Sequence, residues 1–536
     1  MTKYLYILML CFTAITGFYF FLSWAQLPPG QRYIYPIDDV YIHLALARNF
    51  AELGVWSVNI SGFDSASSSI LYTLLLAGLI RLFGDWEYYP LLLNVVFGYL
   101  TVYSVYRYYK DFYGSAELKW AAALILFFPL VYVMVLIGME HTIQMFLMVL
   151  AVYFIRRNVK SDFRCKDFLL LLTVTFFLSM VRFESMFFTV SLAFALFLRK
   201  NYLKGTLILV AGFIAIVVFG IISVQNGGFF FPNSVMVKGS YPAEDHIFMS
   251  MWQLFENGIL LNVSFYKCLF FPLVIIAVYL FEKYRAARLK NLLNETLLIV
   301  VVLTSVLHAL FAVLMYRYEN YLMISLLLIC IPIITHLHEK YRKTELNKSL
   351  LKILTLGSIT AIVLISIYRF GYHHLPLTYM SKGINSQQVE MSRFLGKYYK
   401  GEKIVANDIG AISYFSGVQL LDIVGLGSTD IAEEIVRNKH LSAEENAFKN
   451  KKFIVEYAAK NKFKVAVIYP EWFPGGVPDE WIPVATWKIP EPYGPARQRI
   501  VFYALRSEEE ASLRKNLMEF DRNPNVKQEL LNKVTK

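Results

Sequence analysis

Two adjacent carboxylates, Asp38 and Asp39, stand between two strongly apolar parts of the sequence. Asp38 follows Pro36 closely and can cap a helix predicted over 39–53 by accepting hydrogen bonds from its backbone N–H groups. Capping accounts for one acid but not readily for two. A carboxylate at hydrogen-bond distance can also take the proton of an attacking hydroxyl. We therefore interpret Asp38 and Asp39 as candidate catalytic residues.

The helix predicted over 39–53 is amphipathic. One of its sides carries apolar residues at helical spacing, which are Ile42, Leu46, Phe50 and Leu53. This pattern is typical of a helix that lies at a membrane interface. His43 shares a face with Asp39 four residues earlier, so we count His43 among the candidate donor-binding residues.

Four further motifs combine charged or amide side chains: "GMEH" (138–141), "RFE" (182–184), "FPNSVMVKGS" (231–240) and "YRYEN" (316–320). From them we take Glu140 as a third candidate catalytic acid. The candidate donor- or phosphate-binding residues are Arg182, Asn233, Lys238 and Arg317.

Each of these residues also has a structural interpretation. Glu140 can cap a helix or pair with the histidine that follows it. Arg182 can form an ion pair with the glutamate two residues on and so hold two helices together. Lys238 and Arg317 can anchor helix ends at lipid headgroups. His308, inside an apolar run, is interpreted as a hydrogen-bonded packing residue rather than a ligand.

The elements that must position these residues are mostly membrane helices. The chain of 536 residues is 57% hydrophobic and 17% charged, whereas soluble domains average about 25% charged residues. Apolar runs near the length of a membrane span recur through residues 1–370 and cease after Phe370. We predict a helical polytopic membrane domain over 1–370 and a soluble domain over 371–536.

The positions of basic residues predict the topology. Lys- and Arg-rich connections fall at 107–119, 156–166, 199–204, 282–291 and 338–352. Basic loops face the cytoplasm, so we place them there together with the N-terminus. The short segment 67–83, which carries Arg81, must then lie on or dip into the outer surface, since a true crossing would invert every later loop.

About eleven crossings result from this scheme, and the soluble domain faces outward. The predicted spans are 4–24, 89–108, 119–137, 141–157, 167–181, 185–199, 204–224, 263–281, 294–315, 319–336 and 350–369. The first span has no clear cleavage site after it, so we interpret it as a retained helix rather than a signal peptide. With this topology all the polar motifs above converge on the outer membrane face.

The soluble domain is predicted to be a small α/β unit. Strand-like runs "EKIVAND", "KVAVIYP" and "RIVFYAL" alternate with helical stretches at 429–438 and 443–460. The tail 507–536 is charged and predicted to be helical and solvated. The four cysteines show no spacing that indicates a disulfide framework or a zinc site.

Acids and bases gathered at one membrane face suit the transfer of a sugar from a lipid. The cleavable bond of a lipid-linked phosphosugar lies at headgroup level, and its leaving phosphate needs Arg, Lys or a metal. An outward site cannot reach cytosolic nucleotide sugars, which favours a lipid-borne donor.

The sequence resembles the GT-C membrane glycosyltransferases. The resemblance is carried in order by "DDVYIHLALARNFAELGVWSVN", "SSSILYTLLLAG", the motifs "GMEH", "RFE" and "FPNSVMVK", and "DIGAISYFSGVQLLDIVGLGS" (408–428). The pattern is most similar to the mycobacterial arabinofuranosyltransferases that use decaprenyl-phosphate arabinose, and to related bacterial proteins.

The resemblance implies an inverting transfer from a polyprenyl-phosphate-sugar donor outside the bacterial cytoplasmic membrane. It implies that Asp38 or Asp39 is the base and that Glu140 is a second acidic site residue. Lys238 then becomes a phosphate-binding candidate. The family often has a proline between the Arg and the Glu of this motif, where this chain has Phe183. The lysine-rich composition is unlike that of mycobacterial proteins, so we do not infer arabinose as the sugar.

The implied partners are the lipid donor, the bilayer and an envelope glycan, lipid or protein acceptor, with no nucleic acid. No cofactor is indicated with certainty, and a divalent metal is left open. One alternative is a ligase that moves a glycan from a lipid diphosphate, although such enzymes rely on outer-loop Arg and His. Another is a transporter or flippase, although transporters place charges at mid-membrane and show repeats.

Overall fold

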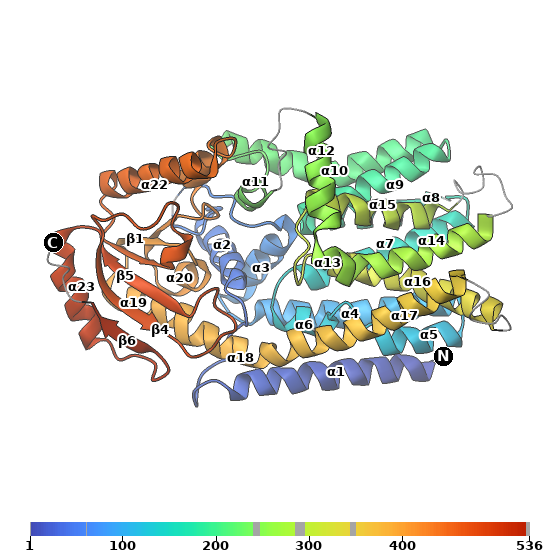
Figure 1. Cartoon of the computed structure of the whole chain (residues 1–536), viewed down its shortest axis with the longest axis horizontal. Coiled ribbons are helices and arrows are strands. Elements are labelled where there is room, and N and C mark those ends of the chain that lie inside the picture. The colour runs from blue at the N-terminus through green and yellow to red at the C-terminus, as the bar shows by residue number, and fades with distance from the viewer. Residues whose placement is uncertain are drawn as a thin grey trace. The chain divides into compact units, whose positions relative to one another are not determined.

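The computed structural model describes residues 2–60, 62–163, 165–239, 247–284, 295–342 and 350–531 (Figure 1). They form two compact units. The helical unit comprises Met1–Phe18, Leu91–Val218 and Gly239–Leu375, and the sheet unit comprises Tyr19–Pro90, Phe219–Lys238 and Pro376–Lys536. The predicted division at residue 370 stays a prediction, and the compact units divide the chain differently because the first polar loop groups with the C-terminal part.

The helical unit is built from long apolar helices. Its helices, some of which extend past its limits, are α1 (Thr2–Ala25), α4 (Tyr89–Phe112), α5 (Ser115–Leu124), α6 (Val131–Leu136), α7 (His141–Lys160), α8 (Cys165–Val181), α9 (Met186–Leu198), α10 (Tyr202–Gln225), α12 (Ile247–Phe255), α13 (Val263–Phe265), α14 (Phe271–Tyr284), α15 (Thr296–Phe311), α16 (Asn320–Tyr341) and α17 (Leu350–Arg369). Shorter turns are the 3-10 helix η1 (Phe183–Ser185) and the π-helical η2 (Glu256–Leu260), η3 (Tyr266–Phe270) and η6 (Phe370–His374).

Within the described ranges, seven helices are long and apolar enough to cross a membrane. Each of them overlaps a predicted span, and the spans predicted at 167–181, 185–199 and 294–315 form shorter helices. The predicted class, a helical polytopic membrane protein with a small α/β part, is confirmed. The number of crossings and their direction stay predictions.

The span predicted over 119–137 is wrong as a continuous helix. Helix α5 ends at Leu124 and α6 begins at Val131. Pro129 lies in the gap, lacks an N–H and restricts the residue before it. Leu130, which caps α6, has a positive φ of 55°, so the chain turns sharply here.

The sheet unit contains helices α2 (Asp39–Leu53), α3 (Ile70–Phe83), α11 (Asn233–Lys238), α18 (Leu375–Ile384), α19 (Glu390–Tyr398), α20 (Gly410–Phe415), α21 (Thr429–Arg437), α22 (Ala443–Lys460) and α23 (Ser507–Glu519), with η7 (Asn385–Val389) and η8 (Pro470–Trp472). Its strands are β1 (Lys403–Ala406), β2 (Gln419–Asp422), β3 (Val465–Ile468), β4 (Ile482–Lys488), β5 (Arg499–Ala504) and β6 (Lys527–Leu530).

The six strands form one sheet in the order β2-β1-β3-β5-β4-β6. Strand β1 pairs in parallel with β2 and β3, and the remaining pairs are antiparallel. Alternation along β5 separates the two faces: Val501 and Tyr503 join a core with Ile454 of α22, whereas Phe502 contacts Phe394 of α19. The sheet is therefore covered on both faces by helices (Figure 1).

Several sequence-based expectations need correction here. Helix α2 has the predicted bounds, but its first half is buried on all sides, so Ile42 and Leu46 pack inside protein rather than at a membrane interface. In the described part of the tail, 507–531, the helix is α23, where Leu513 and Leu517 are buried, and the strand β6 follows it. The basic loops predicted at 282–291 and 338–352 lie partly outside the described residues.

Candidate active site

The two acids that open α2 have different environments. Asp38 is 6% exposed, and its carboxylate makes no capping hydrogen bond to α2. Its Oδ1 accepts from the backbone N–H of Ala411 at 2.8 Å, and its Oδ2 accepts from that of Gly410 at 2.5 Å. The predicted capping of α2 is therefore wrong, because Asp38 instead binds the first turn of α20.

The approach between the loop of Asp38 and α20 is close enough to require glycine. A Cβ atom on Gly410 would lie 2.1 Å from the backbone oxygen of Asp38 and 2.7 Å from its Oδ2. Any larger residue would push the carboxylate away from the two N–H groups. This contact fastens the N-terminal loop to the sheet at the end of β1.

Asp408 completes a group of three acids and was not singled out from the sequence. Its carboxyl group is close enough to that of Asp38 for the two to interact electrostatically, and its Oδ2 accepts from Gln388 at 2.7 Å and from Tyr469 at 3.1 Å. Burial, followed by the negative charge of Asp408, raises the pKa of Asp38 well above its usual value. Burial likewise raises the pKa of Asp408. Asp38 and Asp408 therefore share a proton far more readily than two exposed acids would.

Asp39 lies beside this pair and is half-buried. Its charge raises the pKa of Asp408, so the two side chains are close enough to interact. The candidate donor residue His43, one turn further along α2, is buried. Its Nδ1 lies 3.1 Å from the Oγ of Ser67 and its ring packs edge-on against Tyr72, contacts that fix α2 against α3.

The motif "FPNSVMVK" also lies in the sheet unit, and its last six residues form α11. Asn233 is fully buried, and its amide donates to the carbonyl of Leu426 and to Thr429, each at 3.3 Å. Lys238, at the end of α11, is exposed. Its positive charge acts on Asp422, which ends β2.

Asp422 organises the loop that follows β2. It accepts hydrogen bonds from the backbone N–H groups of Val424, Leu426 and Gly427 at 2.7–2.9 Å. Burial raises the pKa of Asp422 to about 6, although these donors and Lys238 act in the opposite direction. Asn233 and Asp422 thus shape the surroundings of Lys238.

Three polar turns meet in the helical unit, while the convergence of all the motifs on the outer membrane face stays a prediction. Arg182 donates to Glu140 at 2.5 Å and to Glu184 at 2.7 Å, with side-chain exposures of 5%, 0% and 22% for the three residues. Its guanidinium lies over the ring of Tyr318 at 4.7 Å. Arg317 contacts the same ring at 5.2 Å and is half-buried.

Glu140 and Arg182 therefore belong to one buried ion-pair network, and Arg317 lies beside it on the ring of Tyr318. The guanidinium of Arg182 is engaged by two carboxylates, which is the structural interpretation of this residue. His308 is hydrogen-bonded to Tyr321 at 2.9 Å and to the carbonyl of Val313 at 3.2 Å, which confirms the packing interpretation.

A second buried network in the helical unit was missed from the sequence. Arg369 donates to Glu319 and to Asn320, both at 3.3 Å, and to the sulfur of Cys268 at 3.1 Å. Glu319 and Asn320 belong to the quoted motif "YRYEN", but Arg369 ends the last predicted span and was interpreted only as a boundary residue.

Within the described residues no group of three or more His, Cys, Asp or Glu side chains is arranged to hold a metal ion. We therefore assign no metal ligand.

Two segments of the chain match family models. Residues 67–223 match the Dolichyl-phosphate-mannose-protein mannosyltransferase family, and residues 380–503 match a domain of unknown function, DUF8728. No curated protein matches the chain by sequence.

Solved structures match over nearly the whole chain. ArnT from Cupriavidus metallidurans in the apo state is 13% identical over 94% of this chain and 98% of its own, with a TM-score of 0.51. The Archaeoglobus fulgidus oligosaccharyltransferase in complex with Zn and sulfate is 12% identical over 97% of this chain and 74% of its own, with a TM-score of 0.51. The chain has the GT-C fold.

The GT-C resemblance is thus confirmed at the level of the fold, and with the seven apolar helices it identifies a multi-pass membrane protein. The matched segment 67–223 contains Glu140 and Arg182 but neither Asp38 nor Asp39. The finer likeness to the mycobacterial arabinofuranosyltransferases stays a prediction.

Proposed function

We propose that this protein is an inverting glycosyltransferase. It moves a sugar from a polyprenyl-phosphate donor to a cell-envelope glycan, lipid or protein on the outer face of the bacterial cytoplasmic membrane. The observation that carries the proposal is the cluster of Asp38, Asp39 and Asp408 at the start of α2 in a GT-C fold. The match of 67–223 to a family named for dolichyl-phosphate-mannose supports a lipid monophosphate as the carrier.

Asp39 is the better candidate for the general base. Both oxygens of Asp38 accept hydrogen bonds from backbone N–H groups, and burial together with the charge of Asp408 raises the pKa of Asp38. Asp38 therefore positions the loop, whereas the half-buried Asp39 is the carboxylate that an acceptor can reach. A base must lie within hydrogen-bond reach of the proton that it takes.

The reaction then balances without a further reactant. The acceptor oxygen forms a bond to the anomeric carbon while the bond from that carbon to the phosphate oxygen breaks, and the acceptor proton passes to Asp39. The polyprenyl phosphate leaves with added negative charge, which a cation stabilises. Lys238 is the candidate cation of the sheet unit, and Arg317 is the candidate of the helical unit.

The test uses the purified chain in proteoliposomes with three classes of sugar donor. Polyprenyl monophosphates carrying single sugars should be consumed with inversion at the anomeric carbon. Consumption of only diphosphate-linked glycans would make the protein a ligase. Movement of the lipid-linked sugar across the bilayer without cleavage would make it a transporter.

A further inference from the structure

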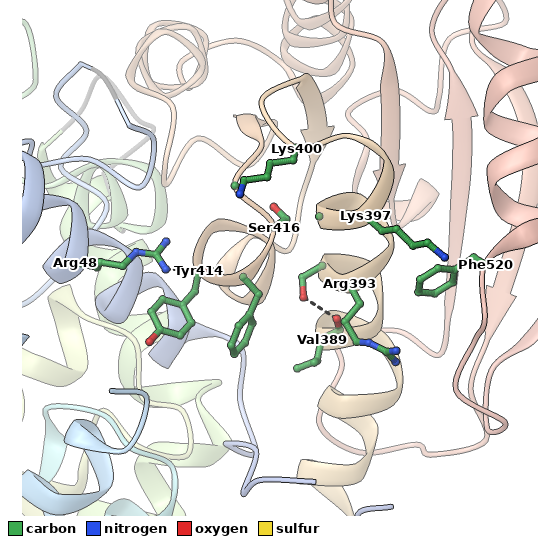
Figure 2. Close-up of a pocket in the computed structure, with 12 residues that line it drawn as sticks. Arg48, Val389, Arg393, Lys397, Lys400, Tyr414, Ser416 and Phe520 are labelled. Carbon is green, nitrogen blue, oxygen red and sulfur yellow. Dashed lines mark hydrogen bonds between the residues drawn. The ribbon is translucent and has the colours of Figure 1, made fainter. Parts of the chain in front are cut away.

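A second site-like feature lies in the sheet unit, apart from the acids described above. A cavity of about 670 Å³ opens between α2, α19 and the turn after α20 (Figure 2). Small-molecule sites typically have volumes of about 300–1,000 Å³. Among the described residues that line it, none belongs to the group of Asp38, Asp39 and Asp408.

The charge around this cavity has one sign. Its lining includes no acidic residue among those described and four basic ones, which are Arg48, Arg393, Lys397 and Lys400. Two of the four already have a carboxylate partner outside the lining, since Arg48 lies 3.7 Å from Asp85 and Arg393 lies 2.7 Å from Glu390. Lys397 and Lys400 are exposed and have no ion-pair partner in the described part of the chain.

The spacing of these bases is unfavourable for α19 by itself. Arg393 and Lys397 are four residues apart on α19, so their like charges lie on one face of the helix, whereas Lys400 follows the end of the helix at Tyr398. Such pairs destabilise a helix. The helix dipole favours one positive charge at the C-terminal end of α19, but it does not explain three bases beside a common hollow.

The cavity also offers one aromatic surface. Of the three aromatic residues described in the lining, Phe415 is 38% exposed, Tyr414 is covered by the guanidinium of Arg48 at 4.7 Å, and Phe520 is buried, with the ammonium group of Lys397 at 5.9 Å from its ring. Figure 2 shows the side chain of Lys400 on one side of the opening and α19, with Arg393 and Lys397, on the other side. An exposed ring near ammonium groups that have no carboxylate partner among the described residues suits a ligand with an apolar ring face and a negative charge, as in a sugar that carries a carboxylate or a phosphate.

We propose that this cavity binds an acidic saccharide segment of the acceptor. Lys397 and Lys400 bind its carboxylate or phosphate groups, and Phe415 packs against a sugar ring. The inference rests on the proposed function, because it assigns the acceptor of that reaction to the class of anionic glycans.

The experiment uses the full chain in nanodiscs of neutral lipid. The probes are a galacturonic acid trisaccharide, the neutral maltotriose and inorganic phosphate, each titrated by calorimetry. The variant Lys397→Gln/Lys400→Gln is compared with the control Lys452→Gln/Lys515→Gln. The two control lysines are 65% and 70% exposed in their side chains and lie outside the cavity, so both variants lose the same charge.

Wild type and control should bind the acidic trisaccharide with equal affinity and bind maltotriose far more weakly. The Lys397→Gln/Lys400→Gln variant should bind the acidic probe about tenfold more weakly, since two exposed charged contacts are lost. The inference is overturned if this variant binds like the control, if maltotriose binds as well, or if phosphate alone accounts for the affinity. It is also overturned if anionic phospholipid in the disc displaces the probe, because the cavity would then serve headgroups.

Donor cleavage by the wild-type chain keeps the two proposals apart. Cleavage of a polyprenyl-phosphate sugar without binding of the acidic trisaccharide removes only the acceptor inference. Binding without cleavage of any such donor removes the glycosyltransferase proposal.

Discussion

Replacing Asp38 by Asn should loosen the contact between the first polar loop and α20. Asp38 uses one oxygen for Gly410 and the other for Ala411. Asn keeps one acceptor oxygen and turns an N–H group toward the second backbone donor. Because a buried donor without a partner costs about 1–3 kcal/mol, Asp38→Asn should lose about that amount, and Asp38→Ala about twice as much.

Hydrogen exchange measured by mass spectrometry is the assay that isolates this effect. A loss of about 1–3 kcal/mol speeds local opening about 5- to 150-fold, so the peptide covering 408–416 should exchange faster by that factor in Asp38→Asn. Asp39→Asn is the matched control and should change this peptide much less, because the N–H groups of Gly410 and Ala411 bind the two oxygens of Asp38. Wild-type exchange in Asp38→Asn would refute the assignment of Asp38 as the residue that positions the loop.

Three further predictions concern stability and topology. The pKa of Asp422 is raised from 3.8 to about 6, so the native state binds this proton more tightly than the unfolded state does. The stability that Asp422 contributes to the protein is therefore lost as the pH rises from about 4 to about 6. With one pKa unit worth about 1.4 kcal/mol, the stability of wild type relative to Asp422→Asn should fall by about 2 kcal/mol over that interval; a constant difference would contradict this. Arg182→Ala leaves Glu140 buried without its cation and should cost about 3–5 kcal/mol in thermal unfolding, and an unchanged melting temperature would show that the ion pair is not formed. In a background without the exposed native cysteines, Glu480→Cys should react with a membrane-impermeant thiol reagent in intact cells and Ser161→Cys should not; the reverse would overturn the predicted topology.

The sequence was sufficient to find the acid pair but not to divide the roles of its members. Residue type and position mark Asp38 and Asp39 equally. What separates them is Gly410, more than 370 residues further on, whose N–H group binds Asp38. A contact between residues so far apart in the sequence leaves no local sequence pattern from which it could be predicted.

Asp408 illustrates a residue that could have been found. It follows the buried run of β1, and ligand-binding side chains commonly lie at the carboxyl ends of parallel strands. The quoted segment 408–428 began with this residue. The predicted strand-like run "EKIVAND" ended at Asp408, but β2 was not predicted, so the parallel pairing of β1 with β2 was not recognised.

The strands β1, β3 and β5 were predicted from the sequence, whereas the edge strands β2 and β6 were not. The runs around Val405, Ala466 and Val501 became β1, β3 and β5, whose burial gives continuous apolar patterns. Strand β4, next to β6, was also missed and contains Pro483, and β6 is mostly polar. Their pairing depends on neighbouring strands rather than on their own pattern.

Sugar transfer by Asp39→Asn tests the central claim most directly. Asn is nearly the same size as Asp but cannot take a proton. With a polyprenyl-phosphate sugar and a hydroxyl acceptor in proteoliposomes, the rate of transfer should fall by about 10²–10⁴-fold, while the melting temperature and the hydrogen exchange of 408–416 stay at their wild-type values. Transfer at the wild-type rate by correctly folded Asp39→Asn would contradict the assignment of Asp39 as the general base.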